Sequence, residues 1–488
     1  MISRTLSACL DGFSGKCVVL EASQQNSLPQ IQITGLPNTV VQESRERIKS
    51  CLAQLGFQVP TRKLLVHLSP AETKKSGSQF DVAIAMALLT LEGFFPSKKI
   101  IKTAFLGELT LSGHFKAINH CIPLLEALLN SAEVEQILIP SENEGDASLF
   151  NSPRIYLCDS FQEALQFCFG ESAPQKLRQP RESKATPLSP TYHFSLEDLR
   201  AQPVAKRALT IALAGRHPLL IEGPPGSGKT HLAHCAASLL PPLTPSETLE
   251  VSRIYSFLGE SRGNNSFAPF RSPHHSISAS AFLGGGHQQV LPGEVSLAHH
   301  GILFLDELPE YRRDALEGLR EPLQSGEIHL HRISKSICLP AQFHLIAAMN
   351  PCRCGYAQSS QHTCICTSEA VTHYRKKISG PLLDRFSLYI WMTSSALNAS
   401  ERDSYDHTTA KTLVQRARDF LKDSCAVSLT PSVQRWLDLL QTKHQMSFRR
   451  QKNLIGVART IAAFEEREAI IETDLEEAWS LRSPETFR

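Results

Sequence analysis

The sequence predicts an α/β protein whose main domain is a parallel sheet flanked by helices. Apolar runs typical of buried strands, at residues 217–221, 301–305 and 343–348, alternate with helical stretches. This alternation is the pattern of parallel strands joined by crossover helices. A glycine-rich turn follows the first of these strands and leads into a helix-forming stretch. From about Leu397 onward the apolar spacing is almost wholly helical, as in residues 411–421.

A linker divides the chain. Residues 171–190 are rich in Pro, Ser and charge and have almost no large apolar side chains, so they cannot bury enough surface to order themselves. Before the linker, strand-like runs at 64–68 and 136–139 mix with helical stretches at 80–89 and 122–129. The sequence thus predicts an α+β domain over 1–170, a linker over 171–190, a parallel-sheet domain over 191–395, and a helical domain over 396–488, which includes the helical stretch 453–467.

Bulk properties indicate a soluble cytoplasmic protein. The amino terminus has no basic segment followed by a long apolar run, and no stretch approaches the ~18 consecutive apolar residues of a membrane span. Thirteen cysteines, an odd number spread over 488 residues, fit reduced thiols better than a disulfide framework. The net charge of +2 gives no overall basic field, so any contact with nucleic acid must come from local patches.

The glycine-rich turn matches the phosphate-binding pattern G-x-x-x-x-G-K-[ST] in full. Its backbone N–H groups and the positive end of the following helix would face phosphate oxygens. Lys229 would contact the β and γ phosphates of ATP, and Thr230 would ligate Mg²⁺. The alternative is a chance turn, but the strand before and the helix after favour a nucleotide site. The predicted loop consists of Gly223, Pro224, Pro225, Gly226, Ser227, Gly228, Lys229 and Thr230.

Two later strands end in polar residues that suit the same site. The run 301–305 ends in Asp306 and Glu307, at the strand end where open α/β sheets bind ligands. Asp306 would hold Mg²⁺ through water, and Glu307 would act as general base on the attacking water. The alternative for Asp306 is a helix cap. The run 343–348 is followed by Asn350, which either orients water or is ordinary turn chemistry before Pro351.

Four cysteines bracket a short polar loop after Asn350. They form two pairs, Cys352 with Cys354 and Cys364 with Cys366. Four thiolates suit tetrahedral Zn²⁺, although the one-residue spacing within each pair is shorter than usual. His362 could replace one ligand, and free thiols are the alternative.

The order of these motifs resembles the AAA+ ATPases, and specifically their magnesium-chelatase-like branch. It runs from the loop 223–230 through Asp306-Glu307 and Asn350 to the segment 380–385 (GPLLDR). The stretches 270–275 (FRSPHH), 301–309 (GILFLDELP) and 457–462 (VARTIA) are similar to the ComM/YifB competence-protein family, and the resemblance covers nearly the whole chain. That family is taken to consist of ring-forming DNA helicases for branch migration of incoming single strands. The resemblance implies an AAA+ sheet with a carboxyl-terminal helical lid.

The resemblance also assigns two arginines. Arg385 matches the arginine finger, which reaches a neighbouring subunit's nucleotide, and Arg449 matches the second sensor in the lid. A surface arginine with an incidental ion pair is the alternative for each. Arg450 follows directly, so the lid assignment could be shifted by one residue.

Residues 1–170 resemble the proteolytic domain of Lon-type proteases, which use a Ser–Lys dyad. In that alignment Gln79 stands where the serine should be and Ile122 stands near the lysine position. Ser76 and Ser78 lie close by, so a shifted register restores a serine but not the lysine. We expect no peptidase activity, and either a binding or ring-organising role or a purely structural one.

Two insertions are candidates for DNA contact. Residues 327–331 and 337–339 predict a hairpin of the kind that related ring ATPases point into their central channel, with Arg332 and Lys335 between the strands. A second insertion, 274–294, is rich in His, Ser and Gly. Small polar and basic residues suit sequence-independent contact with the nucleic-acid backbone. A solvated hairpin tip is the alternative.

Three functions follow from these observations. The leading one is a hexameric homo-oligomeric ATPase that uses ATP and Mg²⁺ to move along single-stranded or branched DNA, without a membrane partner. The second is a metal-chelatase motor, which the Lon-like domain disfavours. The third is an ATP-dependent protease or unfoldase, which Gln79 and Ile122 disfavour.

Overall fold

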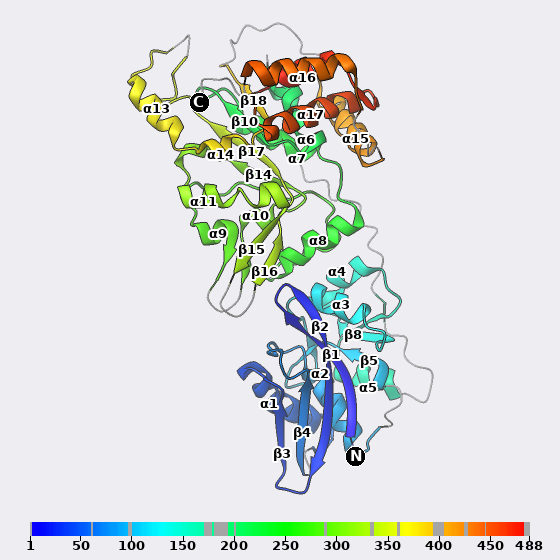
Figure 1. Ribbon diagram of the computed structural model, residues 1–488. Helices are drawn as coiled ribbons and strands as arrows, with labels where there is room; N and C mark the ends of the chain where they lie inside the picture. Colours follow the sequence, from blue (N-terminus) through cyan, green and yellow to red (C-terminus); the bar gives the residue numbers. More distant parts are fainter. Residues whose placement is uncertain are drawn as a thin grey trace. The chain divides into compact units, whose positions relative to one another are not determined.

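The structure is a computed structural model. In it the chain forms two compact units. Unit 1 comprises Met1–Thr186 and Pro245–Asn265, and unit 2 comprises Pro187–Thr244 and Ser266–Arg488 (Figure 1). The described residues are 2–59, 62–95, 100–169, 178–179, 194–199, 202–286, 290–331, 336–358, 362–393, 405–423, 428–444 and 446–482.

Unit 1 is built on a seven-stranded mixed sheet in the order β3-β4-β2-β1-β5-β8-β9. β1 pairs antiparallel with β2, and β2 with β4, whereas β5, β8 and β9 continue from β1 in parallel. The strands are β1 (Ile2–Asp11), β2 (Ser14–Gln25), β3 (Gln30–Thr34), β4 (Lys63–Ser69), β5 (Thr103–Phe105), β8 (Gln136–Pro140) and β9 (Ile155–Cys158), with a small hairpin of β6 (Glu108–Leu109) and β7 (Phe115–Lys116).

The helices of unit 1 are α1 (Thr39–Gln54), α2 (Asp81–Leu91), α3 (Cys121–Leu129), α4 (Glu144–Ala147), α5 (Phe161–Phe169) and α8 (Pro245–Ser256). Every residue of α2 is buried, including Asp81. Arg47 on α1 donates from Nε to Asp81 Oδ2 at 2.8 Å, and Ser44 on the same helix also donates to this carboxylate. A buried carboxylate requires such partners, so this ion pair joins α1 to the central helix of the unit.

The helix α8 packs on unit 1 although it lies far along the sequence, after the first strand of unit 2. Phe257, just beyond the helix, stacks on Phe13 with ring centroids 4.1 Å apart, and Arg253 pairs with Glu126 on α3 at 2.8 Å. Residues 245–265 fall within the sequence range predicted for the parallel-sheet domain, yet they cluster with the amino-terminal unit.

Unit 2 contains the predicted parallel sheet. Its order is β11-β14-β17-β10-β18, and every neighbouring pair is parallel. The strands are β10 (Leu219–Glu222), β11 (Phe270–Arg271), β14 (Ile302–Leu305), β17 (His344–Met349) and β18 (Leu388–Trp391). All residues of β10, β14 and β17 are buried, which explains their continuous apolar character in the sequence.

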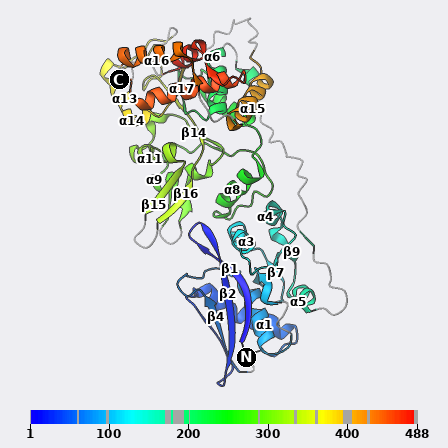
Figure 2. The ribbon, with the colours of Figure 1, turned by 45° about the vertical axis from the view of Figure 1, so that its right-hand side comes forward.

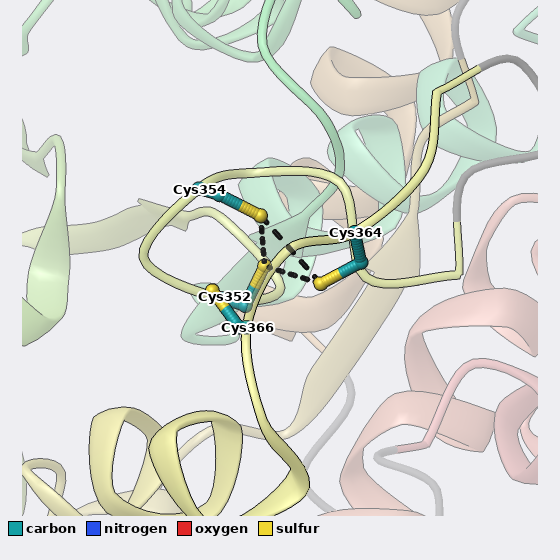
Figure 3. A group of neighbouring side chains, drawn as sticks. All are labelled: Cys352, Cys354, Cys364 and Cys366. Atoms are coloured by element: carbon teal, nitrogen blue, oxygen red, sulfur yellow. Dashed lines mark hydrogen bonds between the residues drawn. The ribbon is translucent and has the colours of Figure 1, made fainter.

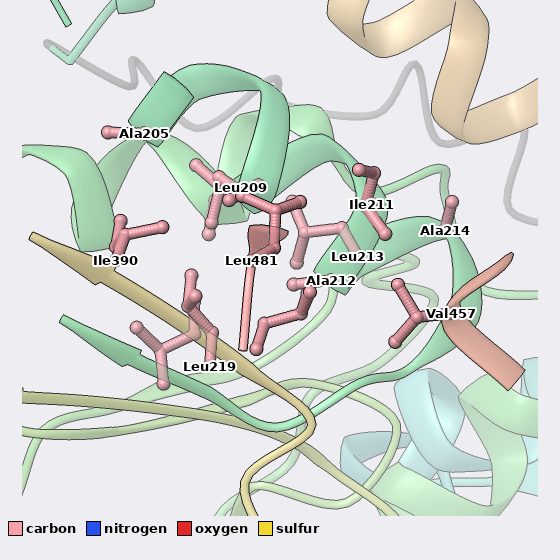
Figure 4. Close-up of a cluster of buried hydrophobic side chains, with 14 of the residues drawn as sticks. Ala205, Leu209, Ile211, Ala212, Leu213, Ala214, Leu219, Ile390, Val457 and Leu481 are labelled. Atoms are coloured by element: carbon pink, nitrogen blue, oxygen red, sulfur yellow. The ribbon is translucent and has the colours of Figure 1, made fainter. Parts of the chain in front are cut away.

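Helices from both ends of unit 2 share its core (Figure 4). Leu209 and Leu213 of α6 pack with Leu219 and Ile390 of the sheet and with Val457 of α17. The longer helices of unit 2 are α6 (Pro203–Gly215), α7 (Lys229–Leu239), α13 (Ser368–Lys376), α15 (His407–Asp423), α16 (Pro431–His444), α17 (Phe448–Ala463) and α18 (Glu472–Ser480). The short ones are α9 (Ala279–Leu283), α10 (Glu294–Leu297), α11 (Arg313–Gly318), α12 (Pro322–Ser325) and α14 (Gly380–Leu383).

Three two-stranded sheets complete unit 2. The insertion 274–294 holds β12 (Gly284–Gly285) and β13 (Leu291–Pro292), and β19 (Ser428–Leu429) pairs with β20 (Ala469–Ile470). The predicted hairpin is confirmed: β15 (Glu327–His331) and β16 (Ser336–Pro340) are antiparallel, and they run side by side in Figures 1 and 2.

The predicted strands and helices named above are confirmed within one to a few residues, except that the stretch predicted over 453–467 ends earlier, because α17 stops at Ala463. The start of the helical region near Leu397 and nearly all of the linker 171–190 lie outside the described residues. In the described part of the chain, no helix is both long and apolar enough to cross a membrane. None of the cysteines described by the structure forms a disulfide.

We predict that Arg47→Gln weakens unit 1 selectively. The change leaves the buried Asp81 carboxylate without its cationic partner, and it should lower the local free energy of unfolding by about 3 kcal/mol. Hydrogen exchange of the α2 amides measures this effect. Trp391, Trp436 and Trp479, the three tryptophans of the chain, all belong to unit 2, so the tryptophan fluorescence transition should not move.

The control is Arg45→Gln on the same helix, because Arg45 contacts only the Gln42 carbonyl group among its hydrogen-bond partners given by the structure. If both variants protect the α2 amides as well as the unchanged chain does, the ion pair has no stabilising role.

Candidate nucleotide site and cysteine cluster

The phosphate loop connects the carboxyl end of β10 to the start of α7. Gly228 has a φ of 90°, in the left-handed region that favours glycine. A Cβ on Gly223 would lie 2.4 Å from the carbonyl oxygen of Met392, so this position also requires glycine. Because α7 begins at Lys229, the free N–H groups of its first turn face the loop, as an anion site requires.

The side chain of Lys229 folds back onto the predicted phosphate loop. Its Nζ donates to the carbonyl oxygens of Gly223 at 2.8 Å and Pro224 at 2.9 Å, and to Asn350 Oδ1 at 3.1 Å. Burial lowers the pKa of Lys229, an effect that the nearby carboxylates of Asp306, Glu222 and Glu307 oppose. The ammonium group can exchange these neutral acceptors for phosphate oxygens. Asn350, from the neighbouring strand, is thereby joined to the loop.

The side chain of Ser227 also fits a phosphate ligand. Its hydroxyl is buried in the loop and has no hydrogen-bond partner among the described residues. A buried hydroxyl without a partner is unfavourable, and a phosphate oxygen would supply one.

Thr230 and Asp306 form the predicted Mg²⁺ pair. Thr230 Oγ1 donates to Asp306 Oδ2 at 2.8 Å, and the other carboxylate oxygen accepts from the backbone N–H of Glu307 at 2.9 Å. A hydroxyl and a carboxylate at this separation are the hard oxygen ligands that Mg²⁺ prefers beside substrate phosphates. The residues therefore fit the ion.

Glu307 sits in a strained conformation next to a histidine. Its φ of 52° lies in the left-handed region, which is unfavourable for a residue with a Cβ and is often found at functional sites. His275 Nδ1 lies 3.4 Å from Glu307 Oε2. Only its place in the His-rich stretch between the two nucleotide motifs marked His275 in the sequence. The histidine places the insertion 274–294 in contact with the predicted general base.

A buried charge cluster supports the strand before the loop. Glu222, the last residue of β10, is fully buried, accepts from Arg375 Nη2 at 2.8 Å and accepts from the Tyr389 hydroxyl at 2.6 Å. Burial raises the pKa of Glu222, and the bonds from Tyr389 and Arg375 oppose this. None of these three residues belongs to a motif that is visible in the sequence. The only available signal was a carboxylate at the end of an apolar strand.

The four predicted cysteines meet in one cluster (Figure 3). The Sγ atoms of Cys352, Cys354 and Cys364 are 3.3, 3.5 and 3.7 Å apart, and the Cys366 sulfur lies within 4.8 Å of all three. Zinc–sulfur bonds of about 2.3 Å place the sulfurs of a tetrahedral site roughly 3.8 Å apart, so little movement is needed to bind the ion. The His362 ring instead contacts the Tyr356 ring at a tilted angle, with ring centroids 4.7 Å apart.

Partial burial and hydrogen bonds between the sulfurs raise the pKa of the Cys364 and Cys366 thiols, so the thiolate character that suits a metal ligand is found on Cys354. Hydrogen bonds from the backbone N–H groups of Tyr356 and Ile365 lower the pKa of the Cys354 thiol to about 6. Cys352, the buried member, accepts from the backbone N–H of Ala357 at 3.3 Å. Such N–H to sulfur bonds stabilise thiolates.

The cysteine cluster and the phosphate loop are packed against each other. Gly355 has a φ of 88°, and a Cβ there would lie 2.6 Å from Pro225 Cδ. At the other end of the cluster, Cys366 is followed by Thr367, whose hydroxyl caps α13. Helix α13 carries Arg375, which binds Glu222. The cluster thus adjoins the loop directly through Gly355 and indirectly through α13.

The remaining predicted residues lie elsewhere. Arg385 donates to the carbonyl oxygens of Pro381 and Arg320, and Arg449 donates to Gln324 Oε1 at 3.4 Å. Arg450 pairs with Asp384. Arg332 and Lys335 lie outside the described residues.

The two positions aligned with the Lon dyad lie in unit 1. Gln79 donates from Nε2 to the carbonyl oxygen of Ser76 at 2.9 Å, and Ile122 is fully buried.

Comparison with known proteins identifies the family. The family model described as magnesium chelatase, subunit ChlI, matches residues 195–400, and a second, described as subunit ChlI of Mg-chelatase, matches residues 20–143. The uncharacterized protein YifB of Salmonella typhimurium is 34% identical over 97% of this chain and 95% of its own length. The chain belongs to the magnesium-chelatase-like ComM/YifB family.

Other relatives agree with this assignment. The competence protein ComM of Haemophilus influenzae is 32% identical over 97% of this chain and 96% of its own length. A magnesium-chelatase 67 kDa subunit of Chlorobaculum parvum is 27% identical over only 32% of this chain. As a member of the ComM/YifB family, the chain is an AAA+ ATPase of the magnesium-chelatase type, which implies ATP and Mg²⁺ as its ligands.

We predict that Gly355→Ala lowers the affinity for ATP about tenfold, because the added Cβ would displace Pro225 and deform the loop. Binding of a fluorescent ATP analogue measures this effect. The control is Gly93→Ala, which has a similar φ of 81° but open space around the new Cβ. Unchanged ATP affinity in Gly355→Ala would mean that the cysteine segment does not shape the loop.

Proposed function

We propose that this protein is a ring-forming ATPase, a homo-hexamer in the cytoplasm, that moves single-stranded or branched DNA during recombination of incoming strands. The observation that carries the proposal is the convergence of Lys229, Thr230, Asp306, Glu307 and Asn350 at one edge of a parallel sheet. Similarity over nearly the full chain to a relative named as a competence protein supports DNA as the substrate.

The site suits in-line transfer of the γ-phosphoryl group to water. Lys229 and the N–H groups of the loop hold the β and γ phosphates. Thr230 and Asp306 would hold Mg²⁺, which would neutralise charge on the phosphate oxygens. Glu307 polarises the attacking water, and Asn350 orients it. Arg385 of a neighbouring subunit stabilises the charge of the transition state.

The β15–β16 hairpin is the proposed DNA contact. Ile328 and Leu339 anchor it through buried side chains, whereas His329 and Cys338, paired across the strands, are exposed. Arg332 and Lys335, which lie between the two strands in the sequence, are the proposed source of positive charge for backbone phosphates. The insertion 274–294 is a second candidate, because His275 links it to Glu307.

Two other functions compete with this one. A metal-chelatase motor is favoured by the family match to ChlI, but the relative named as a chelatase subunit covers only a third of this chain. Protein remodelling is the other. For unit 1 we propose a binding or ring-organising role without peptidase activity, since Gln79 and Ile122 cannot act as nucleophile and base.

The test is the ATPase rate of the purified protein with and without single-stranded and forked DNA. We expect DNA to stimulate hydrolysis. The Glu307→Gln variant should still bind ATP but hydrolyse it at least about a hundredfold more slowly. The double variant Arg332→Gln/Lys335→Gln should keep its basal ATPase rate and lose only the stimulation by DNA. ATP hydrolysis that no DNA alters would overturn the DNA motor and favour a protein substrate, and partner-dependent metal insertion would favour a chelatase.

We also propose that Cys352, Cys354, Cys364 and Cys366 hold a structural zinc ion. The purified protein should contain about one zinc per chain, as elemental analysis measures. Cys364→Ser should lose the metal, whereas Cys17→Ser, which changes a partly exposed cysteine of unit 1 outside the cluster, should keep it. Equal zinc content in the two variants would contradict the site.

A further inference from the structure

The β15–β16 hairpin carries three side chains with metal-binding groups on one of its faces. His329 of β15 lies directly opposite Cys338 of β16 in the antiparallel ladder. Glu327 comes two residues before His329, so its side chain leaves the same face of the strand. The ligand atoms of Glu327, His329 and Cys338 all lie within 4.8 Å of one another, and all three residues are exposed. The hairpin thus brings a carboxylate, an imidazole and a thiol together at the surface.

The other face of the hairpin keeps these three side chains where they are. Ile328 and Leu339, which are paired across the strands and alternate with the three polar residues, are both buried. A register shift of one residue would turn the apolar pair outward and the charged groups inward, which is strongly unfavourable. The burial of Ile328 and Leu339 therefore fixes the register that places His329 opposite Cys338.

The separation of the polar atoms is close to that of a metal site. His329 Nε2 lies 3.6 Å from Glu327 Oε2. Bonds of about 2.0–2.2 Å from zinc to nitrogen and oxygen place two such ligands of a tetrahedral site roughly 3.4 Å apart. A second carboxylate, that of Glu321 at the start of α12, lies 4.0 Å from the same nitrogen. It is near enough to become a fourth ligand after a small movement, and water fills that position otherwise.

The chemistry of the three groups selects the kind of ion. Thiolate and imidazole suit Zn²⁺, whereas Mg²⁺ prefers oxygen ligands alone. Partial burial, and then a hydrogen bond to the Glu327 carboxylate, raise the pKa of the Cys338 thiol to about 11. An ion must therefore displace the thiol proton, which makes binding weaker than at thiols that are already ionised. Exposed ion pairs of His329 with the two carboxylates are the alternative, but they leave the thiol without a role.

We propose that Glu327, His329 and Cys338 bind a zinc-type divalent cation that joins the two strands of the hairpin, at a site separate from the cysteine cluster. The Cys338 thiol releases its proton to water as the sulfur–metal bond forms. Because the site is exposed and has three protein ligands, the ion exchanges with free metal in solution. Dialysis without zinc should therefore empty the hairpin site and leave the zinc of the cysteine cluster in place.

The first test counts zinc per chain by elemental analysis after equilibrium dialysis against a zinc buffer. His329→Gln and Cys338→Ser should each hold about one zinc fewer than the unchanged chain. The control is His373→Gln, which changes an exposed histidine of α13 outside the groups of close metal-binding side chains found in the described residues, and its zinc content should be normal. Unchanged zinc content in His329→Gln would overturn the site. So would a loss in His329→Gln without a loss in Cys338→Ser, because a lone histidine would then bind the ion.

The second test measures the site directly through its thiol. The rate at which iodoacetamide alkylates Cys338 is followed by mass spectrometry of the peptide that contains this residue, starting from protein dialysed without zinc. Added Zn²⁺ should slow the reaction about tenfold or more, because a metal-bound sulfur is a poorer nucleophile, and Mg²⁺ should have no effect. The protection should disappear in His329→Gln, whose exposed substitution leaves the buried anchors of the hairpin intact. Alkylation that Zn²⁺ does not slow would contradict the proposal.

The hairpin site stands or fails independently of the other proposals, since its tests involve neither ATP nor DNA. Cys364→Ser should lose the zinc of the cysteine cluster and keep the protection of Cys338. If Zn²⁺ protects Cys338 in a protein whose ATPase rate no DNA alters, the DNA motor fails and the hairpin site remains. If DNA stimulates hydrolysis and Zn²⁺ leaves Cys338 unprotected, only the hairpin site is overturned.

Discussion

The parallel register of the unit 2 sheet is the constraint on which the site depends. Because β10, β14 and β17 run in the same direction, their carboxyl ends meet at one edge. That edge receives Lys229, Asp306 and Asn350 from three distant parts of the chain and brings them within hydrogen-bonding distance of one another or of Thr230. The same register sends Arg385, before β18, to the opposite edge. One arrangement of strands thus places the candidate nucleotide site at one end of the strands and Arg385 at the other.

The segment between β17 and β18 holds this edge in place. It passes from Asn350 through the cysteine cluster to α13, and it touches the phosphate loop where Gly355 meets Pro225. Its helix returns Arg375 to the buried Glu222 at the end of β10. A metal at the cysteines would stiffen a loop too short and polar to hold its shape by burial alone. The cluster is thus connected to the ATP chemistry without contributing a catalytic group.

The two units are joined by more than a linker. The chain leaves unit 2 after Thr244 and returns at Ser266, and Leu243 N–H donates to Ser266 at 2.7 Å to close the neck of this excursion. Between these points Phe257 stacks on Phe13, and Ser261 donates to Asp146 at 2.6 Å. The segment 245–265, which follows the nucleotide-loop helix α7 in the sequence, is therefore part of unit 1. The chain connects the two units covalently at both ends of this segment.

The sequence alone predicted the parallel sheet, the phosphate loop, the polar residues at the strand ends, the hairpin and the cysteine set, because each is a local pattern of strand periodicity or ligand spacing. It did not reveal the partners that come from elsewhere in the chain: His275 beside Glu307, the Glu222–Arg375–Tyr389 cluster, or the bond from Arg385 to the Arg320 carbonyl group. Nor could it assign residues 245–265 to the amino-terminal unit. Those features depend on which side chains share a surface after the sheet has formed, and a single sequence carries no record of contacts between residues that are far apart along the chain.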